Sequence, residues 1–462
     1  MSASPTAAAR LAAFCADIRW DDIPLEVRER TKDFLLDSLG VTFRGTLEAS
    51  SKPPVDYVRG LQAGGPSSVI GEGFRTSAPW AAMVNGTAAH AIEMDDVTSE
   101  SSLHPAVCAI PAAVAVAEER GADGAALVAA IVAGYELTLR VGNALNPSSA
   151  YQRGFHPTSI AGVFGAATAA AHLMGLSATQ LTDALGICGS MASGSMEYLS
   201  DGAWTKRINA GWAAHAGVVA AGLAAAGFNG PPTILEGPHG FLSAFTDAPK
   251  TARLLDDLGE FYQIETVSIK PYGCCRYNHG IIDCMFALRE EHGITPEQVE
   301  KIRFSVLSAG RDLVAEPIEQ KQAPENVVDA QFSAHFAAAV ALARGVADVN
   351  QFTPESIQDP VLRELTSKTE HHFNPAIDRL YPLQWRTEAE IELSDGRVVA
   401  TEIDHATGEP ENPVPREGLV EKFILLAEPL LQGAAVQDLT RQILTIDSEP
   451  GRLETVMGTL RR

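Results

Sequence analysis

The sequence predicts a mainly α-helical protein with a large all-α domain and a smaller α+β domain. Its 462 residues exceed the roughly 250–300 residues at which a single hydrophobic core stops growing, so two domains are expected. Residues 81–228 form Ala- and Gly-rich segments with helical spacing, whereas apolar and polar residues begin to alternate after Thr266. We therefore assign residues 1–265 plus 410–462 to the large domain and residues 266–409 to the small one.

The helices of the large domain are predicted from start signals and small side chains. Asp22-Ile23-Pro24 places an acidic residue and a proline where a helix begins, and Ser177 with Gln180 forms a capping box. Because small side chains let helices approach closely, the Ala-rich stretches are expected to form a compact bundle. These stretches include Pro105–Glu118, Gly124–Leu145, Ser159–Met174 and, as a packed core helix, Ala213–Phe228.

The small domain is predicted from a change of period. Strands are expected where apolar and polar residues alternate, and a turn at Asp395-Gly396 between two such runs indicates a hairpin. A helical tail is expected to follow. The predicted elements are a strand at 267–270, a helix at 279–292, strands at 299–306, 387–393 and 397–403, a helix opening at 353–355, and the tail helix at 417–431.

Charge and cysteine content narrow the classes of partner. The net charge of −23 disfavours nucleic acid and anionic membrane surfaces, so neither is expected as a partner. The six cysteines are sparse and unevenly spaced, and the N-terminus does not resemble a secretory signal, which indicates a reducing, cytoplasmic location.

Carboxylates crowd together directly after an Ala-rich helix. Glu93, Asp95 and Asp96 lie within four positions, and like charges this close raise at least one pKa, which suits acid–base chemistry. The alternative is an ordinary solvated helix end.

Two histidines each precede a proline that starts a helix. His104 and His156 occupy matching positions about fifty residues apart, so both rings are expected at helix N-termini that face one cavity. For either residue alone, a histidine that simply caps its own helix is the simpler interpretation.

Cations concentrate in two further segments. Lys206-Arg207 enters an Ala-rich helix, and the segment from Lys270 to His279 adds Tyr272 and Arg276 without any acid. Together they predict a local positive patch that holds an anionic substrate within an acidic protein. The alternative is an exposed loop with ordinary basic residues.

No metal or redox cofactor is expected. Cys274-Cys275 lacks the paired spacing of zinc ligands, and neither a P-loop nor a dinucleotide-binding fingerprint follows a strand.

These segments, taken in order, resemble the MmgE/PrpD family, which includes 2-methylcitrate dehydratase, cis-aconitate decarboxylase and iminodisuccinate epimerase. The motifs that carry the resemblance are Asn85–His90 with Glu93-Met94-Asp95-Asp96, Leu103-His104-Pro105, Gly154–Thr158, Thr205-Lys206-Arg207, Lys270-Pro271-Tyr272 with Cys274-Cys275 and His279, and Asp329–Ser333. One departure is Glu93, which stands where the family usually has the first aspartate of an Asp-x-Asp-Asp stretch.

The resemblance implies a large all-α domain, built from the N-terminal part and the tail, with a smaller α+β lid inserted between them. It also implies a cofactor-free homodimer with its active site in the cleft between the two. By this likeness the site acid is Glu93 or Asp95, the site lysine is Lys206, and the site histidines are His104, His156 and His279.

The reactions of these enzymes share proton transfer at a carbon next to a carboxylate. We expect a lyase, either a dehydratase or a decarboxylase, for a small di- or tricarboxylate such as 2-methylcitrate or cis-aconitate. The alternatives are an epimerase of an imino- or aminopolycarboxylate and a non-catalytic binding protein of the same fold.

The expected roles follow from charge and titration range. His104 and His279 are the expected proton donor and acceptor, with His156 and Asp95 positioning them. Cations that face the developing charge stabilise it most, so the residues expected to bind substrate include both lysines. Besides the catalytic Lys206, these binding residues are Glu93, Lys270, Tyr272, Arg276 and Arg207.

Overall fold

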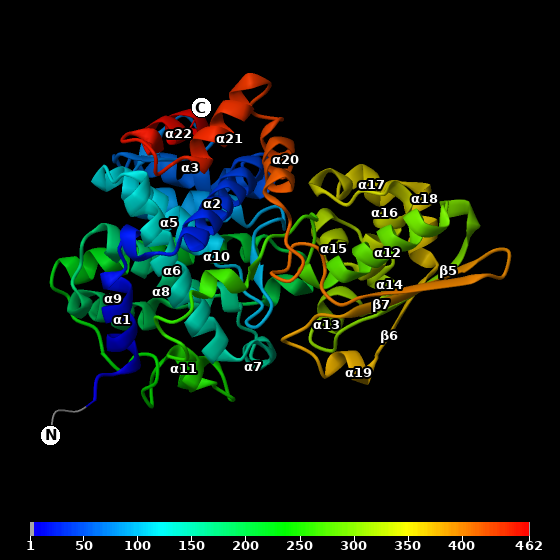
Figure 1. Ribbon diagram of the computed structural model, residues 1–462, viewed down its shortest axis with the longest axis horizontal. Helices are drawn as coiled ribbons and strands as arrows, with labels where there is room; N and C mark the ends of the chain where they lie inside the picture. The colour runs from blue at the N-terminus through cyan, green and yellow to red at the C-terminus, as the bar shows by residue number, and fades with distance from the viewer. Residues whose placement is uncertain (1–3, 462) are drawn as a thin grey trace.

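The computed structural model describes residues 4–461, which fold into two lobes that lie side by side (Figure 1). The helical lobe carries the N-terminal helices and the C-terminal tail, and the α+β lobe lies between them in the sequence. The mainly α class is therefore confirmed.

Three long helices, α6, α8 and α10, lie near the centre of the helical lobe. α10 packs against α8 and α4, and α6 packs against α8. The helices of this lobe are α1 (Ala7–Asp17), α2 (Leu25–Gly45), α3 (Lys52–Leu61), α4 (Ala78–Ala89), α5 (Ala106–Arg120), α6 (Gly124–Leu145), α7 (Pro147–Gln152), α8 (Pro157–Leu173), α9 (Ala178–Met191), α10 (Thr205–Ala225), α11 (Phe241–Phe245), α20 (Arg416–Ala427), α21 (Ala434–Leu444) and α22 (Arg452–Leu460).

Glycines set the close spacing of these helices. A methyl group added at Gly211 of α10 would lie 2.2 Å from the carbonyl oxygen of Met83 in α4. The two backbones meet there only because glycine has no side chain.

Two helices of this lobe, α6 and α10, are long and apolar enough to cross a membrane by composition. The apolar window of α6 is 89% buried inside the protein, whereas that of α10 is 56% buried. The expectation of a packed core helix thus holds for one side of α10, and Trp212 and Leu223 are exposed on its other side.

The α+β lobe has a four-stranded sheet in the order β6-β5-β7-β8. β5 (Val299–Ser305) pairs in parallel with β6 (Thr369–His372) and antiparallel with β7 (Thr387–Leu393), which forms a hairpin with β8 (Val398–Ile403). Alternate residues of β7 are buried, so one face of the sheet packs on a core. The helices are α12 (His279–His292), α13 (Arg311–Val314), α14 (Ile318–Lys321), α15 (Val327–Gln331), α16 (Ala334–Arg344), α17 (Pro354–Gln358), α18 (Pro360–Ser367) and α19 (Pro375–Asp378).

The helical lobe has two short strand pairings, one local and one between segments that are distant in the sequence. β1 (Ser67–Ser68) pairs with β2 (Arg75–Thr76), and β3 (Val97–Thr98) pairs antiparallel with β4 (Val267–Ser268) where the chain leaves this lobe. After the α+β lobe the chain returns, and α20 lies beside α2 (Figure 1). The predicted domain limits at 265/266 and 409/410 stay a prediction.

Element by element, the sequence predictions are accurate where periodicity is strong. The helices expected at 124–145 and 279–292 have those limits, and the capping box of Ser177 and Gln180 is present. Several predicted segments extend past the observed ends, among them a strand and the tail helix. The strand expected at 267–270 ends at Ser268, since only two residues find a partner in β3, and the tail helix ends at Ala427.

Candidate active site

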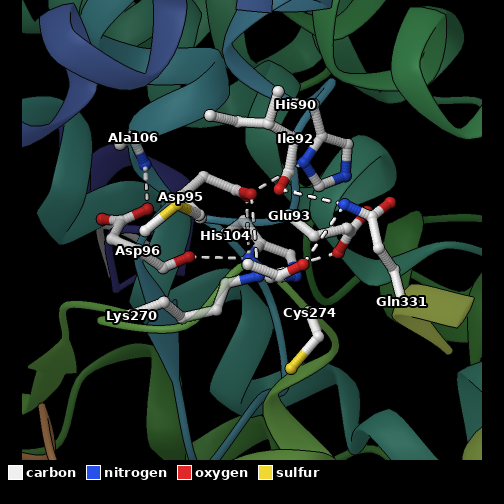
Figure 2. Close-up of polar contacts among 12 residues, drawn as sticks. His90, Ile92, Glu93, Asp95, Asp96, His104, Ala106, Lys270, Cys274 and Gln331 are labelled. Carbon is white, nitrogen blue, oxygen red and sulfur yellow. Dashed lines mark hydrogen bonds and ion pairs between the residues drawn. The ribbon is translucent and has the colours of Figure 1, made fainter. Parts of the chain in front are cut away.

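The acidic segment after α4 is buried, and the alternative of a solvated helix end is wrong. Glu93, Asp95 and Asp96 are 5%, 2% and 1% exposed, respectively. Glu93 has a φ of 57°, in the left-handed region that non-glycine residues seldom adopt. The carboxylates of Glu93 and Asp95 lie toward Lys270, whereas that of Asp96 points away to the backbone N–H of Ala106 (Figure 2).

Two of the carboxylates are paired with cations and stay ionised. Glu93 forms an ion pair with Lys206, and its second oxygen lies 3.7 Å from Lys270 Nζ. Asp95 Oδ1 lies 3.6 Å from the same Nζ. Burial alone would raise both pKa values, but Lys206 and Lys270 lower the pKa of Glu93 to about 2. Lys270 and His104 likewise outweigh burial and hold the pKa of Asp95 well below its ordinary value.

Asp96 has a different environment. It accepts hydrogen bonds from Tyr135 Oη at 2.8 Å and from the backbone N–H of Ala106 at 3.0 Å. Burial raises its pKa well above the ordinary value despite these bonds. Asp96 therefore fastens the start of α5, and the expected upward shift in one of the three acids falls on this residue.

The hydrogen bonds of His104 define its tautomer. Its Nδ1 lies 2.6 Å from the carbonyl oxygen of Asp96 and 3.0 Å from Asp95 Oδ2. A carbonyl oxygen can only accept, so Nδ1 carries a proton and Nε2 of the neutral ring is free to take one. The ionised Asp95 also stabilises the imidazolium that forms when Nε2 is protonated.

Two further histidines lie against this pair. His90 Nδ1 is 2.9 Å from Asp95 Oδ2, and the His90 ring stacks on His156 with centroids 5.6 Å apart. Burial lowers the pKa of His90 to about 4, and burial with the neighbouring His90 lowers that of His156 well below its ordinary value. Both rings are therefore uncharged at neutral pH.

A narrow cavity of about 50 Å³ lies between the two lobes beside these groups. His104, His156 and Lys206 line it from the helical lobe, and Arg276 and Trp385 from the α+β lobe. The full lining is Glu93, Val97, Ser102, His104, Tyr151, His156, Met196, Tyr198, Lys206, Cys275, Arg276, Tyr277, Leu313, Phe332 and Trp385.

Five of the predicted residues line this cavity, and two lie directly behind it. The five are Glu93, His104, His156, Lys206 and Arg276. Asp95 and Lys270 are 2% and 0% exposed and contact the cavity residues from behind. Lys270 therefore acts on the acids beside it, and the expectation that it contacts substrate directly does not match its position.

The structure does not bring His279, Tyr272 or Arg207 into the cavity lining. Tyr272 Oη donates to Asp283, and the His279 ring packs on Tyr272 with centroids 5.0 Å apart, so both side chains face the interior of the α+β lobe. Arg207 follows Lys206 on α10 and points to another side of the helix, where it contacts Ser50 Oγ at 2.5 Å and Glu48 at 3.7 Å.

The aromatic wall of the cavity was not predicted from the sequence. Tyr277 stacks on Trp385 with centroids 4.4 Å apart, and its hydroxyl lies 3.2 Å from that of Tyr381. Tyr151 Oη donates to the carbonyl oxygen of Ser102 at 3.1 Å. Isolated aromatic residues in a sequence are most often core residues, and nothing in their spacing distinguishes these.

Lys422 of the tail helix α20 is a further residue that was not predicted from the sequence. Its ammonium group pairs with Asp37 Oδ1 of α2 at 2.5 Å. It also donates to the carbonyl oxygens of Met94 at 2.8 Å and Lys270 at 2.7 Å. The tail thereby joins the acidic segment to the segment that carries Lys270.

Outside the cavity, residues 4–461 contain one cluster with the geometry of metal ligands, formed by His405, Glu409 and Glu411. Glu409 is already ion-paired with Arg276, and His405 Nδ1 lies 3.0 Å from its other oxygen. We interpret the cluster as an ion-pair network that orients Arg276.

A buried cavity with ionised carboxylates, neutral imidazoles and a lysine is the arrangement of an acid–base active site between two lobes. The model of the MmgE/PrpD N-terminal domain matches residues 9–253, and that of the MmgE/PrpD C-terminal domain matches residues 272–446. The chain belongs to the MmgE/PrpD family, as the resemblance of its motifs predicted.

Curated relatives of the chain are named cis-aconitate decarboxylase, so the family includes lyases. The Aspergillus terreus protein is 28% identical over 460 residues, which cover 95% of this chain and 93% of the relative. The Mus musculus protein is 29% identical over 423 residues, which cover 89% of this chain and 84% of the relative. The Homo sapiens protein is 27% identical over 435 residues, which cover 91% of this chain and 88% of the relative.

Proposed function

We propose that this chain is a cofactor-independent lyase that acts on a small polycarboxylate by proton transfer next to a carboxylate. Decarboxylation is our first choice because the relatives are named decarboxylases, and dehydration is the alternative within the same class. The observation that carries the proposal is His104, whose Nδ1 is held by Asp95 and the Asp96 carbonyl while the residue lines the cavity beside Lys206.

In this proposal the bond between a substrate carbon and its carboxylate breaks, and carbon dioxide leaves. The electron pair that stays on carbon is delocalised onto a neighbouring carboxylate, where Lys206 stabilises the charge. His104 takes up a proton from solvent at Nε2, and Asp95 stabilises the imidazolium so formed. His104 then delivers this proton to carbon and returns to the neutral form. For a dehydration the same imidazole, in its neutral form, would remove the proton next to the carboxylate. The C–O bond on the adjacent carbon would then break, and the imidazolium would protonate the departing hydroxyl group, which leaves as water.

We also propose that the α+β lobe acts as a lid. It supplies the aromatic wall and Arg276, and the cavity between the lobes is narrow. Opening of the lobes would admit substrate, and closure would exclude water and strengthen the charge interactions.

Two further proposals concern the setting of the enzyme. All six cysteines are free and buried, which supports a reducing, cytoplasmic location. The exposed apolar side chains Trp212 and Leu223 of α10 offer a surface for the homodimer that the resemblance implies. Light scattering of the purified protein tests the dimer by its molar mass.

The proposed reaction is tested by proton NMR in deuterated water with EDTA present. The acids to be screened are cis-aconitate, trans-aconitate, citrate, 2-methylcitrate and iminodisuccinate. A lyase removes the starting compound and gives a product of lower mass, whereas inversion with deuterium uptake and unchanged carbon skeleton would show an epimerase instead. If every compound stayed unchanged, the proposed reaction would have to be abandoned for these acids.

Variants then test the residues. His104→Ala and Lys206→Ala are expected to lower kcat by at least 10²-fold, which is typical for loss of a general acid or a charge-stabilising group. Arg207→Ala is the matched control, since Arg207 is adjacent to Lys206 but faces Glu48 and Ser50. Near-normal turnover in both site variants would contradict the assignment.

A further inference from the structure

We propose that Glu93 is a specificity-determining residue that fills one carboxylate position inside the cavity. The enzyme would then take a substrate with two carboxylates and an uncharged arm in preference to a tricarboxylate. This inference rests on the proposed function, because it narrows the substrate class of the same site.

Two permanently cationic side chains reach the cavity. Among the lining residues of the described chain, Lys206 and Arg276 are the permanent cations. His156 is held neutral by burial, and the proton that His104 carries in the proposed reaction passes to the substrate. Lys206 contacts Glu93, and Arg276 contacts Glu409. Each cation can accept one substrate carboxylate beside its protein partner, so the cavity offers places for two.

A third cation, Lys270, lies behind the cavity. Its Nζ lies 3.7 Å from Glu93 and 3.6 Å from Asp95, and its side chain is 0% exposed. Its ammonium group lies behind these two acids and, unlike Lys206 and Arg276, does not line the cavity. Glu93 itself lines the cavity, so its carboxylate stands where a third substrate carboxylate would meet Lys206 and Lys270. A buried anion without a cation partner is costly, which disfavours a trianionic ligand.

Beside Arg276, the rest of the opposite wall is aromatic and uncharged. Tyr277 and Trp385 stack on each other, and Lys206 Nζ lies 4.8 Å from the centre of the Phe332 ring. The Tyr277 hydroxyl is engaged by Tyr381, so the wall offers ring faces more than hydrogen-bond donors. Such a wall favours an apolar substituent over a carboxylate.

The backbone holds Glu93 in place. Its φ of 57° places it in a conformation that costs on the order of 1 kcal/mol for a non-glycine residue. Both flanking carbonyls are fastened, that of Ile92 by Gln331 Nε2 at 3.2 Å and that of Met94 by Lys422 Nζ at 2.8 Å. The carboxylate of Glu93 is thus a fixed part of the cavity.

Calorimetric titration with unreactive saturated acids tests the inference. The probes are tricarballylate with three carboxylates, methylsuccinate with two, and benzylsuccinate with two and an aromatic arm. The wild type is expected to bind benzylsuccinate at least tenfold more tightly than tricarballylate. E93Q keeps the shape and removes the charge, so it is expected to shift the affinity ratio of tricarballylate to methylsuccinate at least tenfold toward the tricarboxylate.

Controls separate this result from other effects. E48Q removes a carboxylate beside Arg207, outside the cavity, and should leave the ratio unchanged. If E93Q fails to fold, Trp385→Leu replaces it and should weaken benzylsuccinate while leaving tricarballylate unaffected.

Three outcomes would overturn the inference: tighter binding of tricarballylate to the wild type, an unchanged ratio in E93Q, or no binding of any probe. These readouts do not depend on turnover. A protein that converts cis-aconitate and binds tricarballylate most tightly would refute the inference and leave the proposed lyase intact. The expected binding order without turnover of any screened acid would support the inference and refute the proposed lyase reaction for those acids alone.

Discussion

Replacing Lys422 by methionine keeps the approximate length of the side chain and removes the charge that holds Asp37. Both side chains are buried, at 8% and 2% exposure. The change would leave the Asp37 carboxylate without its cation and the carbonyl oxygens of Met94 and Lys270 without their donor. Removing one member of a buried ion pair typically costs about 3–5 kcal/mol, and we expect a loss of that size.

The assay is urea unfolding followed by far-UV circular dichroism, which reports mainly on the helical lobe. Lys301→Met is the control, because Lys301 and its partner Glu370 are 35% and 51% exposed. An exposed pair of this kind contributes about 0–1 kcal/mol. The double variant Asp37→Asn with Lys422→Met should be more stable than Lys422→Met alone, since it contains no unpaired buried charge.

The pH dependence gives an independent check. Burial already raises the pKa of Asp37 in the presence of Lys422, and removing the lysine should raise it further. An acid whose pKa is raised in the folded state destabilises the fold fully above that pKa. The penalty shrinks as pH falls from that pKa toward the unfolded-state pKa and is absent below the latter. The cost of Lys422→Met should therefore shrink on acidification. A loss under 1 kcal/mol at neutral pH, or a double variant less stable than the single one, would refute this reasoning.

Three further predictions concern other parts of the helical lobe, each checked by the same unfolding assay. Gly211→Ala should destabilise the protein by about 1–3 kcal/mol because its methyl group would overlap α4. Gly222→Ala on the same helix meets nothing within 4 Å and should stabilise the protein by about 0.5–1 kcal/mol. Equal effects of the two substitutions would contradict the close approach of α10 and α4. Burial lowers the pKa of His90 to about 4, so between pH 6.5 and pH 4 the unfolded chain binds a proton that the folded protein does not. Stability should therefore fall as pH drops from about 6.5 to about 4, by up to about 1.4 kcal/mol per pH unit. His90→Gln should flatten this slope, and an unchanged slope would show that His90 is not its source. Tyr135→Phe should cost about 1–3 kcal/mol, since Asp96 Oδ2 would lose its donor at a buried site, and a neutral effect would mean that water replaces the hydroxyl.

Much of the fold follows from local patterns. The helix at 124–145 and the helix at 279–292 were placed to the residue because apolar spacing and their end residues agree. The hairpin at 387–403 follows from its alternation and its Asp-Gly turn. The strand at 267–270 was too long because strand length depends on a partner, and the partner segment at 97–98 carries no strand signal of its own.

The candidate site was predicted in composition and less well in arrangement. The two His-Pro helix starts place His104 and His156 at one cavity, where His156 is the N-cap of α8. His279 has the right residue type, but the turn before α12 directs its ring into the α+β lobe. Lys422 lies more than 300 positions from the acidic segment that it fastens, and contacts at such separation leave no local pattern in the sequence.

The position of the tail also bears on the order in which the chain becomes structured during synthesis. Residues of the α+β lobe are contiguous and have their own core around Phe304 and Phe336, so this lobe is complete soon after it leaves the ribosome. The helical lobe begins first but finishes last, because α20 covers α2 only once the final segment has emerged. Until then Asp37 has no ammonium partner, and Val41, which shares a small core cluster with Leu426 of α20, lacks part of its cover. We expect nascent chains that stop before residue 416 to hold a folded α+β lobe beside an unfinished, chaperone-dependent helical lobe.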